Sequence, residues 1–362
     1  MNWFITTTNR CNLSCKYCQN EPHPDLPIRP SWKVEDLERF VSSDKSPTIC
    51  FYGGEPLLHM ELVQEVMDNI PAEHYTLQTN GLLLHKLPTK YLHQFSSILV
   101  SIDGDENRTD DSRGKGTFHK IAANVQDIRE RGFEGDLIAR MTVHEGSSIF
   151  GDVLFLLTDE NLGFDHIHWQ LDVLWDESID TRWHDFDKWA KYYNKGISKL
   201  VDYWLEKMKT EGEVKGIIPF IGTFKHILNN TSTDLPCEAG LRSFAIRTDG
   251  KLTICPLPPE YEFTVVGDIT SSTPQTVRNS LEVGSKCKEC EVYGLCGGRC
   301  LFAEKTKLWG EDGFNKVCDI TKHYIAELKK IKPQVLELIE KGVIKSEDFD
   351  YPEYNNTTEI IP

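Results

Sequence analysis

The chain has 362 residues, of which 39% are hydrophobic and 27% are charged, values typical of one large globular domain with a smaller one. Its formal net charge of −16 argues against a nucleic-acid-binding surface, which would be basic. No apolar run reaches the ~20 residues of a membrane span. Residues 1–4 also lack the basic region of a signal peptide. We therefore expect a cytoplasmic protein with neither a nucleic-acid nor a membrane partner.

Strands and helices are predicted to alternate through the first 210 residues. Apolar and β-branched runs predict strands at residues 2–8, 48–52, 75–79, 97–102, 137–143 and 166–173. Helical spacing is seen around residues 62–67, 89–95, 117–131 and 149–161. Such alternation predicts right-handed βαβ units that form a partial α/β barrel of six units. Chemistry in such barrels gathers at the carboxyl ends of the strands.

Three thiols follow the first predicted strand in one short loop. Cys11, Cys15 and Cys18 have three residues and then two residues between them. This spacing can hold one face of a four-iron cluster but leaves it one ligand short, whereas ordinary ferredoxin runs bring a fourth Cys. The chain has 11 Cys, which in a cytoplasmic protein are better interpreted as metal ligands than as disulfides.

Polar turns end the next three strands. Gly53, Gly54 and Glu55 follow the second strand, where glycine would let the backbone approach a ligand and the carboxylate could pair with an ammonium group. Asn80 and Ser101 lie in the turns after the third and fourth strands. Each of these segments can also be an ordinary strand-ending turn.

The C-x3-C-x2-C run resembles the signature of radical S-adenosylmethionine (SAM) enzymes. The resemblance implies that Cys11, Cys15 and Cys18 hold a 4Fe-4S cluster whose open iron binds the amino and carboxylate groups of SAM. In that family, an electron from the cluster splits SAM into methionine and a 5′-deoxyadenosyl radical, which removes a hydrogen atom from the substrate. A zinc knuckle or unrelated thiols are the alternative interpretation.

The same resemblance assigns further SAM contacts. Tyr17 would lie beside the adenine, with packing under the loop as the alternative. Arg113 would pair with the SAM carboxylate, with a solvated surface Arg as the alternative. The full set of cofactor-binding residues implied by the resemblance is Tyr17, Gly53, Gly54, Glu55, Asn80, Ser101 and Arg113.

Polar residues within two strands are candidates for the cavity. Arg140 interrupts the apolar fifth strand, where a charge is costly unless paired, so we expect it to line the cavity opposite a carboxylate or the substrate. His168, Gln170 and Asp172 alternate along the sixth strand and face either the cavity or solvent. A general base is not assigned, and Asp103, Asp172 and Arg140 are the cavity candidates.

A long amphipathic helix is predicted over residues 182–210, with an aromatic stripe typical of a core or domain interface. Residues 211–236 carry several Gly, Pro and Asn residues, a pattern that suits a bridge between domains. A closing helix is predicted over residues 319–342, followed by a polar tail.

Seven further thiols form a second cysteine field in residues 237–318, at positions 237, 255, 287, 290, 296, 300 and 318. Asp249-Gly250 separates two apolar runs and predicts a hairpin that ends at Cys255. Gly297 and Gly298 permit a tight turn around a metal. A pair of zinc sites is a rival interpretation, but seven thiols do not divide into two complete four-ligand sites.

This field resembles the SPASM domain, an extension of some radical SAM enzymes that holds two auxiliary 4Fe-4S clusters. The resemblance assigns Cys287, Cys290, Cys296 and Cys318 to the second auxiliary cluster. It assigns Cys237, Cys255 and Cys300 to the first, whose fourth ligand is either absent, leaving an iron open to a substrate thiolate, or supplied by a group such as His226 or Glu238. Arg299 departs from the family, in which Gly is common at this position.

The expected fold class is therefore α/β, a partial (β/α)6 barrel followed by a small cysteine-rich α+β domain. The expected boundaries are residues 1–210 for the barrel, 211–236 for the bridge, 237–318 for the SPASM domain and 319–362 for the closing helix and tail. The cofactors implied are SAM and three 4Fe-4S clusters.

SPASM radical SAM enzymes mostly modify ribosomally made peptides or activate other enzymes. The resemblance therefore implies an oxidoreductase that cross-links or oxidises a peptide or protein and takes electrons from a ferredoxin or flavodoxin. Pro256 stands where sulfatase-maturing relatives carry a basic Asp, so sulfatase activation is not favoured. The alternatives are a SPASM dehydrogenase acting on a small molecule and a non-enzymatic Fe-S electron carrier.

Overall fold

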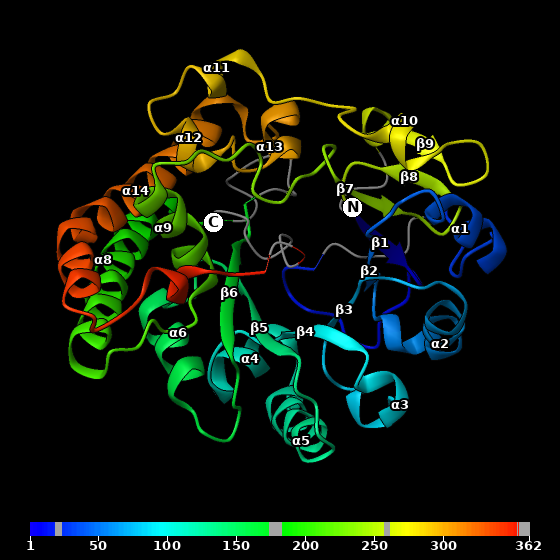
Figure 1. Ribbon diagram of the computed structural model, residues 1–362, viewed down its shortest axis with the longest axis horizontal. Helices are drawn as coiled ribbons and strands as arrows, with labels where there is room; N and C mark the ends of the chain where they lie inside the picture. The colour runs from blue at the N-terminus through cyan, green and yellow to red at the C-terminus, as the bar shows by residue number, and fades with distance from the viewer. Residues whose placement is uncertain (19–23, 174–182, 257–260, 353, 355–362) are drawn as a thin grey trace.

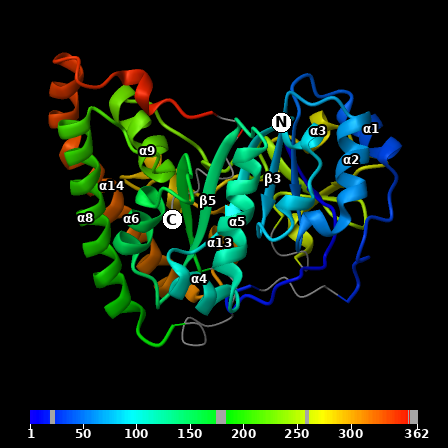
Figure 2. The same cartoon turned by 90° about the horizontal axis from the view of Figure 1, so that it is seen from below.

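The computed structural model describes residues 1–18, 24–173, 183–256, 261–352 and 354. Six parallel strands form the barrel half of one curved sheet, with helices on its outer side (Figures 1 and 2). The strands are β1 (Asn2–Thr6), β2 (Thr48–Tyr52), β3 (His74–Thr79), β4 (Phe95–Ser101), β5 (Asp136–Val143) and β6 (His166–Leu171). The helices between them are α1 (Val34–Val41), α2 (Met60–Asn69), α3 (Thr89–Leu92), α4 (Glu106–Arg113), α5 (Thr117–Glu130) and α6 (Ile149–Thr158). The predicted βα alternation and the α/β fold class are confirmed.

The second cysteine field joins the same sheet. The strand order is β6-β5-β4-β3-β2-β1-β7-β8-β9, so β7 (Ser243–Ile246) pairs in parallel with β1. The predicted hairpin is confirmed, because β7 and β8 (Lys251–Thr253) are antiparallel, and β9 (Val265–Asp268) adds to its far side. Short helices follow: α10 (Pro274–Val277), α11 (Ser285–Lys288), α12 (Tyr293–Cys296) and α13 (Leu301–Thr306).

The two faces of the sheet differ in chemistry because successive side chains alternate between them. Residues such as Phe51, Leu77 and Trp169 are buried under the outer helices in the main hydrophobic core. The pairing register places Ser101, Arg140 and His168 side by side on the opposite, inner face. The inner face is therefore the polar one, as a ligand cavity requires.

Two long helices pack against the side of the barrel. The predicted helix over residues 182–210 is α8 (Phe186–Glu211), whose aromatic stripe is buried as expected, while residue 182 lies outside the described part of the chain. α14 (Gly310–Glu340) lies along it, and His323 Nε2 is 3.0 Å from the Asn194 carbonyl oxygen of α8. α14 begins nine residues before the predicted start, so it contains Cys318.

The predicted bridge is a helix over much of its length. α9 (Ile218–Asn229) starts with Pro219 in its first turn and ends at Asn230 in the left-handed conformation. The Gly, Pro and Asn residues of this segment predict a loop-like bridge, but Pro at the start and Asn at the end of a helix are also helix-terminating signals. Phe220 and Phe224 pack on Trp204 of α8. Other predicted boundaries differ by a few residues, and α3 ends at Leu92 because β4 already begins at Phe95.

Phe349, Tyr351 and Tyr354 pack at the amino end of the barrel. Phe349 is fully buried against Trp204 and Phe224. Tyr351 then donates a hydrogen bond to Asp136, the first residue of β5, at 3.1 Å. Tyr354 stacks on His74, the first residue of β3, with ring centroids 3.8 Å apart. These three residues therefore lie at the end of the barrel opposite the cysteine loop.

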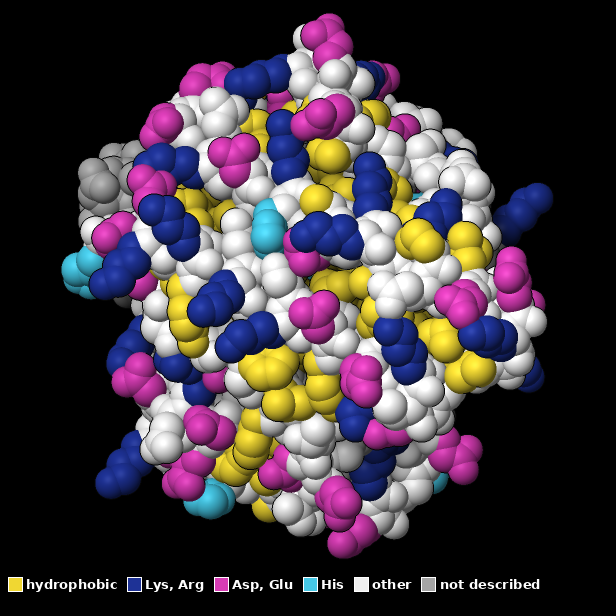
Figure 3. Space-filling model, turned by 90° about the vertical axis from the view of Figure 1, so that its left-hand side faces the viewer, with side chains coloured by type: hydrophobic (Ala, Val, Ile, Leu, Met, Phe, Trp, Pro, Cys, Tyr) yellow, Lys and Arg dark blue, Asp and Glu magenta, His cyan; other side chains and the backbone are white. Residues whose placement is uncertain are grey.

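The face that carries α8 and α14 shows both signs of charge interspersed (Figure 3). Pairs such as Lys316 with Asp187 and Lys207 with Glu211 join neighbouring side chains there. Among the described helices, none combines the length and the apolar character that crossing a membrane requires.

Candidate active site

The first cysteine loop is held in place by the glycine turn after β2. Gly54 N–H donates to the Thr8 carbonyl at 2.9 Å, and Glu55 N–H donates to the Arg10 carbonyl at 2.8 Å. A Cβ atom on Gly54 would lie 2.2 Å from the Arg10 oxygen, and one on Gly53 (φ +140°) would lie 2.4 Å from the Thr8 oxygen. These glycines therefore admit the cysteine loop itself, whereas we expected them to admit a ligand.

The three thiols of this loop lie near one another at the carboxyl end of β1. Cys11 and Cys15 are partly buried, and Cys18 is exposed. Burial raises the pKa of Cys15 to about 11; Arg113 lowers it, while Cys18 and Cys11 raise it further. Asn80 Nδ2 lies 3.6 Å from Cys11 Sγ. The loop thus presents three sulfurs beside one cation, a donor set that fits an iron–sulfur cluster.

Glu55 is a fully buried carboxylate that organises the end of β3. It accepts hydrogen bonds from Thr79 Oγ1 and Asn80 N, both at 2.8 Å, and from Leu57 N at 3.1 Å. Burial raises the pKa of Glu55 to about 7, although the three hydrogen bonds lower it. The carboxylate therefore positions Asn80 beside Cys11. Its contact with a SAM amino group stays a prediction.

Arg113, Asp103 and Tyr17 form a second buried network under the loop. Arg113 donates to both carboxylate oxygens of Asp103, and Tyr17 donates to the same carboxylate at 2.6 Å. The Arg113 guanidinium also lies over the Tyr17 ring, 5.4 Å from its centroid. Arg113 is therefore not a solvated surface residue. Its pairing with a SAM carboxylate, and the place of Tyr17 beside an adenine, stay predictions.

The inner face carries a second cation. Arg140 donates to Gln170 Oε1, and its Nε is buried without a hydrogen-bond partner. Burial lowers the pKa of Arg140. No carboxylate of the described residues forms an ion pair with it, so of the two expected partners, a carboxylate or the substrate, only the substrate stays a prediction. His168 and Asp172 are also buried, which rules out the solvent-facing alternative for both.

Tyr52 lies at the end of β2 on this inner face, packed against Phe4, Cys50 and Ala245. Burial raises its pKa, Arg140 lowers it, and Cys18 and Cys255 both raise it. The Tyr52 hydroxyl is therefore within electrostatic reach of both cysteine fields.

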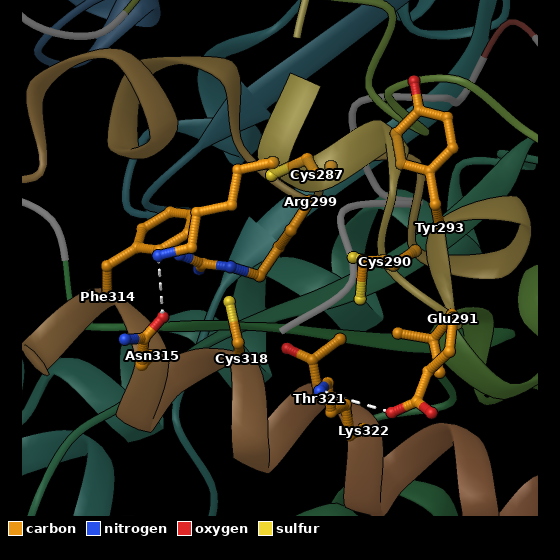
Figure 4. A pocket seen from close by; sticks show the side chains of 14 residues that line it. Cys287, Cys290, Glu291, Tyr293, Arg299, Phe314, Asn315, Cys318, Thr321 and Lys322 are labelled. Carbon is orange, nitrogen blue, oxygen red and sulfur yellow. Dashed lines mark hydrogen bonds and ion pairs between the residues drawn. The ribbon is translucent and has the colours of Figure 1, made fainter. Parts of the chain in front are cut away.

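Four thiols of the second field surround one cavity of about 400 Å³. Figure 4 shows Cys287, Cys290 and Cys318 around it, and Cys296 completes the set. Burial raises the pKa of Cys287 to about 11, and the charge of Glu304 and the thiolates of Cys318 and Cys290 also raise it. Four thiols from α11, α12 and α14 and the turns beside them thus line one cavity. Such a donor set would suit an iron–sulfur cluster, an assignment that stays a prediction.

The remaining three thiols are less closely gathered. Burial and the charge of Cys300 together raise the pKa of Cys237 to about 12, so these two thiols interact electrostatically. Glu238 is ion-paired with Arg242, whose Nε lies 2.7 Å from its carboxylate. His226 Nδ1 faces Thr231 Oγ1 at 2.9 Å. The Glu238 charge also raises the pKa of Cys237, and the assignment of a fourth ligand to His226 or Glu238 stays a prediction.

Residues 5–149 match the family model described as the radical SAM superfamily. This match contains the cysteine loop, the Gly-Gly-Glu turn and the Asp103–Arg113 pair. The chain contains a radical SAM domain over these residues. Enzymes of this superfamily use a 4Fe-4S cluster and SAM, and the three thiols at the carboxyl end of β1 stay the predicted cluster ligands.

A curated relative covers most of this radical SAM enzyme. It is named as a cysteine-type anaerobic sulfatase-maturating enzyme of Clostridium novyi strain NT, and it is 24% identical over 326 residues, or 81% of this chain and 85% of the relative. A second, named as the radical SAM cyclopropyl synthase TigE of Paramaledivibacter caminithermalis, is 21% identical over 90% of this chain and 73% of its own.

Solved structures share the fold of the radical SAM enzyme. A structure described as anSMEcpe with bound AdoMet and a Cp18Cys peptide has a TM-score of 0.74 at 21% identity, covering 94% of this chain and 99% of the other. SuiB from Streptococcus suis, bound to the precursor peptide SuiA, has a TM-score of 0.56 at 17% identity, covering 83% and 71%. At these identities the likeness is one of fold.

Sequence reasoning missed two residues of this site. Tyr52 directly precedes the Gly-Gly-Glu turn, and its place at the end of an alternating strand was the available signal. His144 stands just after β5, where its Nε2 lies 3.1 Å from Ser112 Oγ and its ring lies 6.0 Å from that of Tyr17. No motif singles it out, because strand β5 and helix α4 bring it to Tyr17 only in the folded chain.

Proposed function

We propose that this radical SAM enzyme modifies a ribosomally made peptide or protein by cross-linking or oxidation. The observation that carries the proposal is the polar inner face, on which the strand register places Ser101, Arg140 and His168 side by side, with Tyr52 at the end of β2 on the same face. A substrate side chain on the inner face beside Tyr52 would lie near both the first cysteine loop and the second cysteine field. The sulfatase-maturating name of a relative and the bound peptides of anSMEcpe and SuiB support a peptide substrate.

The proposal assigns three 4Fe-4S clusters to this chain. Cys11, Cys15 and Cys18 would hold the first, and residues 237–318 would form a SPASM domain with two more. One auxiliary cluster takes Cys287, Cys290, Cys296 and Cys318, and the other takes Cys237, Cys255 and Cys300. When bound, the first cluster and SAM supply a hydrogen-abstracting radical, and the auxiliary clusters supply an electron acceptor or a substrate-binding iron.

The protein residues position and shield the reacting groups. Glu55 and the glycine turn hold the cysteine loop, and Asn80 is placed beside Cys11. Arg113 and Asp103 fix Tyr17 beneath the loop. With Ser101 these residues form the proposed SAM site, while Arg140 and Gln170 would bind a polar group of the substrate. A closed, dry cavity of this kind protects a radical from side reactions.

Loss of two hydrogens from the peptide balances in three parts. One hydrogen atom passes to the 5′-deoxyadenosyl radical and gives 5′-deoxyadenosine. One proton leaves to a base, and one electron passes to an acceptor. An external donor such as ferredoxin or flavodoxin supplies the electron that cleaves each SAM. Pro256 replaces the Asp that serves as a base in sulfatase-maturing relatives, so the base here is a different group.

The test is the mass of a candidate peptide after anaerobic reaction. The peptide would be encoded by a short open reading frame beside the gene, and the reaction would contain reconstituted enzyme, SAM and dithionite. We expect loss of two hydrogens, with 5′-deoxyadenosine formed, and fragmentation would locate the change. The C18A variant is the control and should form neither product. Production of 5′-deoxyadenosine with every peptide mass unchanged would contradict cross-linking and oxidation of these peptides and favour a small-molecule substrate.

A further inference from the structure

Arg299 occupies a backbone conformation that its residue type disfavours. It lies in the turn between Cys296 and Cys300 with φ +55°, after Gly297 at φ +59° and Gly298 at φ +86°. The left-handed region is open to glycine but sterically unfavourable for a residue with a Cβ atom. Glycine would satisfy this turn at lower cost, so the side chain of Arg299 has a role that outweighs the backbone preference.

The side chain of Arg299 is buried in the wall of the four-thiol cavity. The residue is 6% exposed and lines the cavity together with Cys287, Cys290, Cys296 and Cys318. In Figure 4 it extends into the cavity alongside Cys318. The guanidinium therefore lies in the wall of the same cavity as the four sulfurs that would hold the cluster.

Arg299 differs from the two lysines of the cavity, which each form an ion pair with a glutamate. Lys286 pairs with Glu311 at 2.5 Å, and Lys322 pairs with Glu291 at 3.3 Å. Both lysines line the same cavity, and their side chains are 56% and 40% exposed. No described carboxylate forms an ion pair with Arg299, and Glu304, whose charge acts on Cys287, pairs with Lys305. A buried cation that forms no ion pair is costly, so an anionic group in this cavity would stabilise Arg299.

We propose that Arg299 tunes the cluster held by Cys287, Cys290, Cys296 and Cys318, raising its reduction potential by stabilising the reduced form. The inference rests on the proposed function, which assigns a cluster to this cavity. One-electron reduction adds one negative charge to the cluster without making or breaking a bond. A fixed, buried guanidinium lowers the energy of that added charge, and net charge and hydrogen bonding near the sulfurs set cluster potentials.

The experiment is an EPR-monitored redox titration of the full chain, reconstituted anaerobically with iron and sulfide and titrated with dithionite. The signal that is lost in the C290A variant identifies the cluster in this cavity. We expect R299Q to move the midpoint of that signal to lower potential and R299K to move it less, because lysine keeps the charge. The matched control is K330Q, a cation of α14 outside this cavity that is paired with Glu327, and its midpoint should stay at the wild-type value.

A second variant covers failure of R299Q to retain the cluster. R299G also removes the charge but suits the left-handed backbone, so it should fold and show the same lowered midpoint. An R299Q or R299G midpoint equal to that of the wild type would overturn the tuning role while leaving the cluster assignment intact. Unchanged iron content and unchanged spectra in C290A would instead overturn the assignment of a cluster to this cavity, and with it that part of the proposed function.

Discussion

Arg113 donates two hydrogen bonds to Asp103, from Nε to one carboxylate oxygen at 2.8 Å and from Nη2 to the other at 2.9 Å. Asp103 also accepts from Tyr17 and from Thr142 N, so its carboxylate joins the cysteine loop, α4 and β5. The Arg113 and Asp103 side chains are 6% and 0% exposed. This buried pair therefore links the cysteine loop to α4 and β5.

Removing one partner of this pair should strongly destabilise the chain. R113Q leaves the Asp103 charge buried without its cation, and we expect a loss of about 3–5 kcal/mol in the free energy of unfolding. Urea denaturation monitored by circular dichroism measures this loss. K16Q is the control, because Lys16 pairs with Asp111 on the surface and such a pair contributes less than about 1 kcal/mol. Equal, small losses in both variants would show that the Arg113–Asp103 pair does not stabilise the fold.

A methyl group at position 54 should displace the cysteine loop. In G54A the new Cβ would lie 2.2 Å from the Arg10 oxygen and 3.0 Å from Cys11 N, both backbone atoms that cannot rotate away. We expect reconstituted G54A to hold less iron per chain than the wild type. G163A is the control, because Gly163 has φ +55° but open space around it. Full iron content in G54A would mean that the loop does not depend on this close contact.

Glu55 should make stability depend on pH. Its folded pKa is raised from 4.5 to about 7, so its stabilising contribution is present below 4.5 and is lost as the pH rises through 7. A shift of this size corresponds to about 3 kcal/mol. In the cluster-free chain, urea unfolding between about pH 5 and about pH 8 should therefore show the wild type losing stability relative to E55Q. Parallel pH profiles of the two proteins would refute the raised pKa.

Cys50 should not be a cluster ligand. It is 3% exposed on the inner face, and burial raises the pKa of its thiol to about 12. A thiol shielded from solvent reacts slowly, so Cys50 should resist alkylation by iodoacetamide in the native apo chain while exposed Cys18 reacts. Peptide mapping reads out both sites. After reconstitution, C50A should keep the wild-type iron content, and C18A should lose iron.

The tail should contribute to stability through Phe349. This side chain is 0% exposed. Its ring centroid lies 5.8 Å from that of Trp204 and 5.3 Å from that of Phe224. F349A leaves a cavity, and we expect a loss of about 3–5 kcal/mol in the free energy of unfolding. L336A is the control, because Leu336 of α14 is 40% exposed and its truncation should change the unfolding midpoint little. If F349A unfolded at the wild-type urea concentration, the docked tail would not be part of the stable fold.

Local patterns were sufficient to predict the barrel. Each strand of β1 to β6 was visible as an apolar run with a polar turn behind it, because parallel strands are buried on both faces and end where ligands bind. The spacing of Cys11, Cys15 and Cys18 involves only residues close in sequence. The radical SAM family model that matches residues 5–149 includes this segment. Helix boundaries were less certain, since α9 and the start of α14 depend on burial against α8 rather than on a clean pattern.

The partners of the buried charges were decided by tertiary structure. The sequence alone determined that this chain has a barrel with a three-thiol loop and a second cysteine field, since spacing and alternation are local properties. It did not determine that Gly54 admits the loop backbone, that Arg113 is bound to Asp103, or that Arg299 faces four thiols without a carboxylate. Those relationships join residues far apart in the chain, and strand register and helix packing set the distances between them.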